Sequence, residues 1–264
     1  MTPRARKIAK HLNRAPEIGR CFLHSRDWLK MSFSYTGLRP HSFPYVARFR
    51  DGSSFEFRDL PDVATWWQIF YRNIYPIKKT DRVIVDAGAN IGAFTLYAAS
   101  RSPAAKIIAI EPFPDTFSRL QSAVERSAFG HRIQLINAAL GSETGWLTMQ
   151  QGDVGSQFRR VVEAGSQQAG VRVRSCTLSE ILDAHDEIDF LKMDIEGSEY
   201  PSILACPAES LRRVRRLAME FHPIYTARAP QPRDLFQHLE KTGLTLTEVQ
   251  DHGEGYGMAY LRRH

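Results

Sequence analysis

From residue 81 onward, short apolar runs rich in β-branched residues alternate with segments in which apolar residues recur at helical spacing. The apolar runs predict strands over residues 83–86, 106–110, 132–136, 188–193 and 217–221. The intervening and following segments predict helices over residues 93–99, 117–128 and 231–242. This alternation is typical of an α/β fold with a mostly parallel sheet and right-handed crossovers.

Four further runs predict additional strands. Residues 244–250 and 257–262 flank a glycine-rich turn, which predicts a terminal hairpin. Strands are also predicted over residues 145–149 and 171–176, on either side of a stretch without clear periodicity, residues 150–170. Because a long loop in a compact domain is usually functional or disordered, we expect residues 150–170 to form a lid over a binding site.

The first 80 residues differ in pattern from the remainder. Residues 1–40 are predicted to form a basic helical appendage with one or two short amphipathic helices. Residues 41–80 are predicted to form a hairpin around Asp51 and Gly52 and a helix over residues 62–74 that is rich in aromatic residues. We expect those rings to pack in the core of the protein, and not to stack on a ligand. Residues 81–264 then form the main domain.

Composition supports a globular protein with one α/β domain and an appendage. The 264 residues are 43% hydrophobic and 24% charged. No apolar run approaches the ~20 residues that a membrane-spanning helix needs, and residues 1–14 lack the apolar core of a secretory signal. We therefore expect a cytoplasmic protein. The three cysteines, Cys21, Cys176 and Cys206, are far apart, which is typical of reduced thiols.

The net charge is +6, and much of the excess lies in residues 1–14 and 212–216. Such segments can attract nucleic acid, an anionic membrane surface or an acidic substrate. Peripheral membrane contact through the basic N-terminus is one interpretation, and a solvated terminus or helix face is the simpler one. Basic and aromatic residues are not interleaved on strands, so nucleic acid is not favoured as a partner.

A glycine-rich turn follows the first predicted strand. The strand ends at Asp86, and Gly88 and Gly92 then flank Asn90. Strand, turn and helix in this order are typical of a nucleotide-type cofactor site, although an ordinary strand-to-helix turn has the same order. The spacing departs from the G-x-G-x-x-G of dinucleotide sites, which counts against a nicotinamide oxidoreductase. Asp86 would also repel a pyrophosphate, whereas it could hold the cationic amine of S-adenosyl-L-methionine (SAM).

The second predicted strand also ends in an acid, Glu111, which lies 19 positions after Gly92. That offset is close to the one at which an acid binds ribose hydroxyls in βαβ nucleotide sites. A solvated charge at the strand end is the alternative. Pro112 ends the strand, and Asp115 or Thr116 is expected to cap the following helix.

Two later strands end in polar residues as well, and ligands of open parallel sheets bind beyond the carboxyl ends of the strands. We therefore expect Asp194 and His222 to converge with Asp86 and Glu111 on one crevice. Asp194, Glu196 and His222 are the candidate proton acceptors, with Asp194 ranked first. Each has an alternative role: Asp194 in holding the methionine part of SAM, Glu196 in binding the acceptor or capping a helix, and His222 in a structural hydrogen bond.

Carboxylates in a cleft would also suit Mg²⁺. A divalent metal is nevertheless not favoured, because the sequence shows no additional ligand. We therefore assign no metal site from the sequence.

These motifs together resemble the FkbM family of SAM-dependent methyltransferases. In chain order they read VIVDAGANIGAFTLYAA, IIAIEPFPDTFSRL, INAALGSETGWLTM, DFLKMDIEGSEY and LAMEFHPIY, and the resemblance covers about residues 55–264. It implies a Rossmann-like class I methyltransferase fold, with a mostly parallel seven-stranded sheet, helices on both faces and an antiparallel C-terminal hairpin. One departure is Ala123, where the family's helix often carries Asn, at a peripheral position.

The resemblance also implies that residues 81–264 bind SAM and that adenine lies near residues 137–139. The small side chains there would let the backbone approach a flat ring, although plain helix–sheet packing explains them equally well. The residues expected to bind the cofactor are Asp86, Gly88, Ala89, Asn90, Gly92, Thr95, Glu111, Pro112, Phe113, Asn137, Ala138, Ala139 and Asp194.

The expected function is SAM-dependent O-methyl transfer, which yields S-adenosylhomocysteine. The resemblance implies a hydroxyl acceptor on a sugar, a glycolipid or polysaccharide unit, or a natural product. The alternatives are a nucleic-acid methyltransferase, suggested by the positive charge, and a non-catalytic SAM-binding protein, since a fold alone does not establish activity. No motif indicates an oligomeric state.

Overall fold

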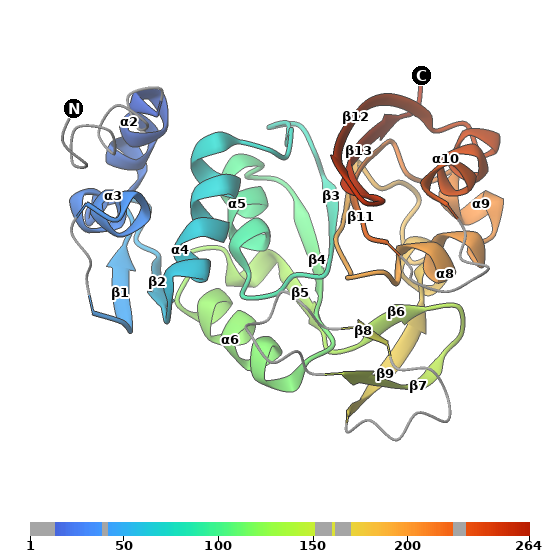
Figure 1. Ribbon diagram of the computed structural model, residues 1–264, viewed down its shortest axis with the longest axis horizontal. Helices are drawn as coiled ribbons and strands as arrows, with labels where there is room; N and C mark the ends of the chain where they lie inside the picture. Colours follow the sequence, from blue (N-terminus) through green and yellow to red (C-terminus); the bar gives the residue numbers. More distant parts are fainter. Residues whose placement is uncertain (1–13, 39–41, 151–159, 162–169, 224–230) are drawn as a thin grey trace.

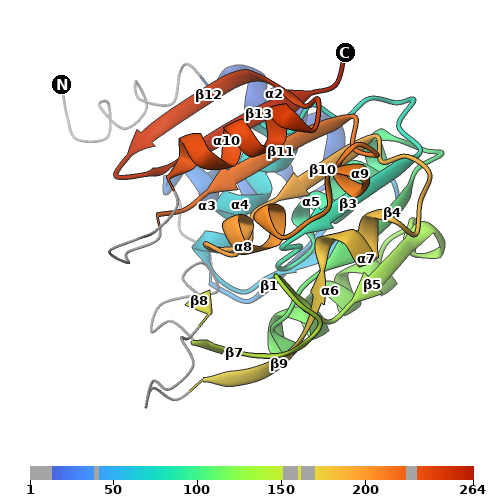
Figure 2. The same ribbon diagram turned by 90° about the vertical axis from the view of Figure 1, so that its right-hand side faces the viewer.

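The computed structural model describes residues 14–38, 42–150, 160–161, 170–223 and 231–264. Within them, a seven-stranded sheet has the order β12-β13-β11-β10-β3-β4-β5 (Figures 1 and 2). Its members are β3 (Val83–Ala87), β4 (Lys106–Ile110), β5 (Ile133–Ile136), β10 (Phe190–Met193), β11 (Arg216–Phe221), β12 (Thr245–Gly253) and β13 (Tyr256–Arg262). All neighbouring pairs are parallel except those made by β13, which is antiparallel to both β11 and β12.

Helices cover both faces of this sheet (Figure 1). One face packs against α4 (Leu60–Trp67), α5 (Ala93–Arg101) and α6 (Pro114–Glu125), and the other against α7 (Leu178–Leu182), α8 (Glu199–Leu204), α9 (Ala208–Leu211) and α10 (Pro232–Lys241). The strands supply alternate residues to the two cores. In β3, Ile84 belongs to the first core and Val85 to the second, as the two-residue period of a strand requires. The predicted Rossmann-like α/β fold, with its antiparallel C-terminal hairpin, is confirmed.

Two helix boundaries differ from the sequence prediction. The helix expected over residues 117–128 is α6, which begins at Pro114 with the extended Phe113 as its N-cap. Asp115 and Thr116 therefore lie inside the first turn and are not the cap, because proline is preorganised for the first helical position. The helix expected over residues 62–74 begins at Leu60, after the N-cap Asp59, and continues into the π-helix η1 (Gln68–Arg72).

The N-terminal elements pack against the face that carries α4 and α5. They are α2 (Ala15–His24), α3 (Trp28–Thr36) and the antiparallel hairpin β1 (Tyr45–Arg48) and β2 (Ser54–Phe57). The aromatic residues of α4 and η1 form the centre of this packing: Trp66 is 1% exposed, and its ring stacks on Phe70 at 4.1 Å between centroids. The expectation that these rings are core residues is confirmed.

A second, smaller sheet projects beside the carboxyl ends of β4 and β5 (Figure 2). It has the order β6-β9-β7-β8, with β6 (Ala139–Gly141), β7 (Gly145–Gln150), β8 (Arg160–Val161) and β9 (Val171–Thr177). Most of the expected lid, residues 151–159 and 162–169, lies outside the described residues. The short 3-10 helix η2 (Gly130–Arg132) precedes β5. None of the described helices has both the length and the apolar character required to cross a membrane.

Candidate active site

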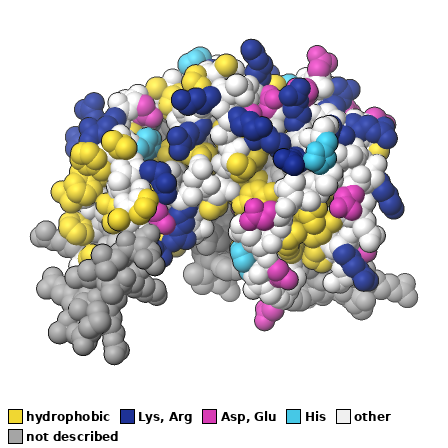
Figure 3. All heavy atoms as spheres, turned by 90° about the horizontal axis from the view of Figure 1, so that it is seen from above, with side chains coloured by type: hydrophobic (Ala, Val, Ile, Leu, Met, Phe, Trp, Pro, Cys, Tyr) yellow, Lys and Arg dark blue, Asp and Glu magenta, His cyan; other side chains and the backbone are white. Residues whose placement is uncertain are grey.

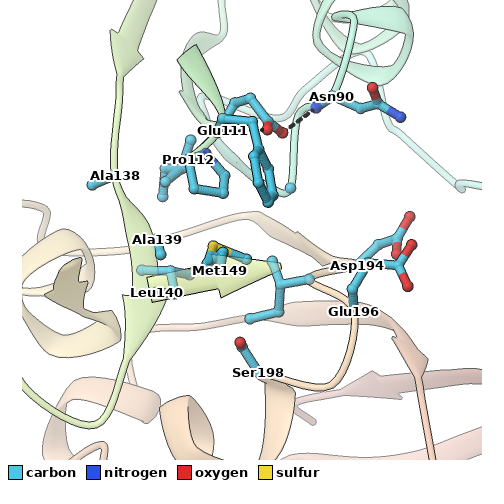
Figure 4. A pocket seen from close by; sticks show the side chains of 14 residues that line it. Asn90, Glu111, Pro112, Ala138, Ala139, Leu140, Met149, Asp194, Glu196 and Ser198 are labelled. Atoms are coloured by element: carbon cyan, nitrogen blue, oxygen red, sulfur yellow. Dashed lines mark hydrogen bonds between the residues drawn. The ribbon is translucent and has the colours of Figure 1, made fainter. Parts of the chain in front are cut away.

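A pocket that opens to solvent lies between the carboxyl ends of β3, β4 and β10 and the small sheet (Figure 4). The pocket is lined by residues of the loop after β3 (Gly88, Asn90), of β4 and the loop after it (Ile110, Glu111, Pro112, Phe113), of β6, β7 and the residue before β6 (Ala138, Ala139, Leu140, Met149) and of the loop after β10 (Asp194, Ile195, Glu196, Ser198).

Gly88 allows two of these loops to touch. Its φ is +79°, and a Cβ atom at this position would collide with the backbone carbonyl oxygen of Asp194. The amides of Gly88 and Ala89 donate to the carbonyl oxygen of Ile110 at 3.0 and 2.9 Å, which ties the turn to β4. Gly92, with φ +91°, leaves room for Leu120 of α6. The glycines of the motif are therefore required by close packing and by backbone conformation.

Glu111 is held in place at the wall of the pocket. Its Oε2 accepts from the backbone N–H of Asn90 at 2.9 Å (Figure 4), and its Oε1 accepts from the N–H of Phe113 at 3.1 Å. The side chain of Asn137 donates to the carbonyl oxygens of Glu111 and Pro112, and these two hydrogen bonds also hold the loop after β4. The backbone amides of Asn90 and Phe113 orient the carboxylate of Glu111 at the pocket wall.

Asp86 does not reach the pocket surface. It is 0% exposed, and its Oδ2 accepts a hydrogen bond from Thr95 Oγ1 at 2.6 Å. Its Oδ1 lies 3.4 Å from Nζ of Lys192, a residue of β10. Complete burial raises the pKa of Asp86, and the lysine counteracts this. The expectation that Asp86 contacts the cofactor amine directly does not fit this placement.

Lys192 is a central residue that sequence reasoning missed. Its Nζ donates to the carbonyl oxygen of Gly88 at 2.6 Å and lies 3.7 Å from Oδ2 of Asp194. Although burial opposes its charge, the carboxylates of Asp86 and Asp194 raise the pKa of Lys192. The available signal was one lysine inside the otherwise apolar strand FLKM. A lysine is almost never fully buried unless it is paired.

A second missed residue, Glu199, organises the loop after β10. It is 0% exposed and accepts from the backbone N–H groups of Ile195 at 2.9 Å and Gly197 at 2.8 Å. Its Oε1 also lies 3.0 Å from Nδ1 of His222. The loop bends sharply here, because Glu196 has φ +56° and Gly197 φ +97°. Glu199 thus fixes the segment that carries Asp194 and Glu196.

His222 lies next to these acids but does not line the pocket. Its Nε2 is 3.6 Å from Oε2 of Glu196. Burial lowers the pKa of His222, but the hydrogen bond and charge of Glu199 outweigh burial and raise it to about 9. Burial raises the pKa of Glu196 to about 8. Burial and the charge of Asp194 together raise the pKa of Glu220 to about 7. Tyr256 donates a hydrogen bond to Glu220.

The predicted site residues therefore divide into two groups. Those at the pocket surface are Gly88, Asn90, Glu111, Pro112, Phe113, Ala138, Ala139, Asp194 and Glu196. Those behind it are Asp86, Ala89, Gly92, Thr95, Asn137 and His222. Met149 of β7 adds an apolar wall opposite Pro112 (Figure 4), although it was not among the predicted site residues. Glu220 had a weak signal, since it lies two residues before His222 in the same strand end and therefore on the same face.

Comparison with known proteins gives consistent results. The chain is 25% identical over 228 residues to the hexuronic acid methyltransferase AglP of Haloferax volcanii, covering 85% of this chain and 89% of that protein. It is 27% identical to the methyltransferase sdnD of Sordaria araneosa, covering 58% of this chain and 72% of that one. It is also 27% identical to a segment of the AMB antimetabolite synthetase AmbE of Pseudomonas aeruginosa, of which it spans only 9%.

Among solved structures, M. jannaschii TYW2 in complex with AdoMet is similar with a TM-score of 0.45 and 15% identity, covering 85% of this chain and 88% of that one. The family described as the methyltransferase FkbM domain matches residues 86–246, more than half of the 264 residues, and this match includes the glycine-rich turn, Glu111 and the loop after β10. The chain therefore belongs to the FkbM methyltransferase family.

Proposed function

We propose that this protein is a SAM-dependent O-methyltransferase that acts on a hydroxyl of a small-molecule or carbohydrate acceptor. The observation that carries the proposal is the acidic wall of the pocket: Glu111, Asp194 and Glu196 line it together. Such a wall favours a ligand that carries a sulfonium and an amine and disfavours a pyrophosphate. A nicotinamide oxidoreductase fits this pocket poorly for the same reason.

The lining residues supply each part of a SAM site. Glu111 would accept from the ribose hydroxyls, because its carboxylate is already oriented by two backbone amides. The apolar side chains of Phe113, Leu140 and Met149 would enclose the adenine. Gly88 and Asp194 meet at the other end of the pocket, where the methionine part would bind. Asp86 and Lys192 would not contact the cofactor, but would hold the backbone of the glycine-rich turn at Gly88 in place.

SAM supplies an already activated methyl group on its sulfonium, so the main task of the protein is alignment. Holding the two reactants in line can contribute roughly 7–11 kcal/mol to lowering the barrier. The acceptor hydroxyl forms a bond to the methyl carbon while its proton passes to a carboxylate, and the electron pair of the broken bond remains on sulfur. Asp194 and Glu196 are the proposed proton acceptors, since both line the pocket. Such a base contributes roughly 10²–10⁴-fold.

His222 has a supporting role in this scheme. It contacts Glu196 and Glu199 and does not line the pocket. It would therefore orient Glu196 and the loop after β10, which is the structural role that the sequence analysis gave as the alternative to a base.

The distribution of charge supports a small acceptor over a nucleic acid. A groove in which Lys and Arg outnumber the acids Asp81, Asp186, Glu187 and Asp189 lies at the amino ends of β3, β10 and β11, opposite the edge that carries the pocket. Figure 3 shows many Lys and Arg side chains on the face seen from above. The basic residues of this groove are Lys78, Arg212, Arg213, Arg215, Arg216, Arg262 and Arg263. A polyanion bound there would not reach the acidic pocket. The similarity to a hexuronic acid methyltransferase supports a sugar acceptor.

Isothermal titration of the purified chain with SAM, S-adenosylhomocysteine and NADH tests the cofactor. We expect micromolar binding of the first two, lost in Glu111→Ala and kept in Glu125→Ala, which changes a surface acid of α6. Methyl transfer from labelled SAM to glucuronic acid and glucuronides then tests the acceptor class. SAM binding without transfer to any hydroxyl would leave a non-catalytic SAM-binding protein, and binding of NADH alone would refute the proposal.

A further inference from the structure

Three metal-ligating side chains meet where β10 and β11 end. Met193 of β10 pairs with Met219 of β11 in parallel register, so Asp194 and Glu220 are the next residues on neighbouring strands. His222 follows two positions later. One ligand atom of each of these three side chains lies within 4.8 Å of the other two. The sequence predicted that Asp194 and His222 converge, but it did not indicate Glu220 as the third member of the group.

The imidazole of His222 is oriented as a metal ligand usually is. Glu199 is fully buried and accepts two backbone N–H groups, so its carboxylate acts as an acceptor toward His222 Nδ1 at 3.0 Å. In the neutral ring, Nδ1 therefore carries the proton, and the lone pair is on Nε2. A histidine that binds a metal almost always donates its other N–H to a carboxylate or carbonyl in this way.

Glu220 has a comparable partner. The hydroxyl of Tyr256, from β13, donates a hydrogen bond to its Oε1. This contact holds the carboxylate of Glu220 through one of its two oxygens. Hydrogen bonds to ligating carboxylates are part of the outer shell of metal sites. The triad thus has two of its three side chains held by defined neighbours.

The charges around the triad are unbalanced. Five carboxylates belong to one connected group: Asp86, Asp194, Glu196, Glu199 and Glu220. Among the described residues, the basic side chains that contact this group are Lys192 and His222. Lys192 contacts Asp86, Asp194 and the carbonyl oxygen of Gly88. Its single positive charge is therefore divided between two carboxylates and does not fully balance that of Asp194. Partly buried charges of one sign are costly unless an opposite charge accompanies them.

We propose that Asp194, Glu220 and His222 form a binding site for a divalent cation of the Mg²⁺ or Mn²⁺ class. Two carboxylate oxygens and one imidazole nitrogen leave coordination positions free for water or for an acceptor oxygen. Because Asp194 also lines the pocket, the ion would lie at the edge of the proposed cofactor site. The ion would bind His222 through the Nε2 lone pair of the neutral ring. The role toward an acceptor rests on the proposed function, whereas the binding of the ion does not.

The test uses the full chain, stripped with a chelator and then dialysed, without SAM. Mn²⁺ is titrated by calorimetry and by the electron paramagnetic resonance signal of the free ion. We expect one ion per chain, with affinity at least about tenfold lower in Glu220→Gln and His222→Gln. Glu248→Gln, an exposed acid on β12, is the control and should bind as the wild type does.

Tyr256→Phe keeps all three ligands and removes only the hydroxyl that contacts Glu220, so it covers the case in which a ligand variant does not fold. We expect it to weaken Mn²⁺ binding by about tenfold. Absence of Mn²⁺ binding to the wild type, or wild-type affinity for Mn²⁺ in both Glu220→Gln and Tyr256→Phe, would overturn the proposal. SAM binding without Mn²⁺ binding would refute only the cation site, and Mn²⁺ binding without SAM binding would refute only the proposed function.

Discussion

Nζ of Lys192 lies 3.4 Å from Oδ1 of Asp86, and both side chains are buried in the centre of the sheet. The two residues are on neighbouring strands, β10 and β3, in direct register. Lys192 also donates to the carbonyl oxygen of Gly88. The pair therefore connects the interior of the sheet to the glycine-rich turn at the pocket.

Lys192→Met should destabilise the protein by about 3–5 kcal/mol, because it leaves the carboxylate of Asp86 buried without its partner. The double variant Asp86→Asn/Lys192→Met should recover part of this loss, since the uncompensated charge is then also removed. Denaturant unfolding gives the free energies, and the exposed Lys79→Met is the control. Equal stability of Lys192→Met and Lys79→Met would contradict the role of the pair.

Gly88→Ala should abolish SAM binding and destabilise the fold, because the new Cβ collides with the carbonyl oxygen of Asp194. Gly52→Ala is a matched control: Gly52 has a similar positive φ of +90°, but no atom lies within 4 Å of an added Cβ. It should cost only about 1–2 kcal/mol, the cost of the left-handed conformation. Calorimetry with SAM and denaturant unfolding of both variants measure the difference. A SAM affinity in Gly88→Ala equal to that of Gly52→Ala would show that the close approach of the two loops is unimportant.

Glu196→Gln should lower kcat by roughly 10²-fold or more while changing the affinity for SAM much less, because a carboxamide cannot take up the acceptor proton. Single-turnover methyl transfer and SAM titration separate the two effects. Asp194→Asn is expected to lower kcat too, but also to weaken Mn²⁺ binding. Wild-type turnover in both variants would remove these carboxylates as proton acceptors.

His24, a residue of α2 that does not belong to the candidate active site, should make the stability of the protein depend on pH. Its ring is stacked between Phe49 at 4.7 Å and Phe70 at 4.8 Å, and burial lowers its pKa to about 4, with Arg101 acting in the same direction and Asp51 opposing it. Its Nδ1 also lies 3.3 Å from the hydroxyl of Tyr71.

Between the unfolded pKa of about 6.5 and the folded value, the unfolded chain binds more protons, so stability falls as the pH decreases. We expect the loss due to His24 to reach about 2 kcal/mol between about pH 7 and about pH 4.5. Denaturant unfolding of the wild type and of His24→Phe at both pH values measures it. The loss of stability due to His24 between these pH values should be absent in His24→Phe. It should remain in His264→Phe, which changes an exposed histidine.

Much of the framework was determined by local sequence. The apolar runs around Val85 and Ile108 defined the strands, because a strand buried on both faces needs an uninterrupted apolar segment. Glu111 was found from its position at a strand end, since the carboxyl ends of parallel strands meet at one edge of the sheet. The start of α6 at Pro114 was missed by a few residues, because both the proline and the acid after it are compatible with a helix start.

Tertiary structure alone decided which charged groups pair in the interior of the sheet. Asp86 and Lys192 are 106 positions apart, and only the strand order β10-β3 makes them a pair and turns Asp86 away from the pocket. In the same way, Glu199 of α8 contacts His222, and Tyr256 of β13 contacts Glu220, only because the sheet brings these elements together. A strand or a glycine turn depends on interactions between nearby residues and therefore leaves a periodic signal in the sequence. A cluster of buried charges depends on which distant segments become neighbours, and that is fixed only when the whole sheet is assembled.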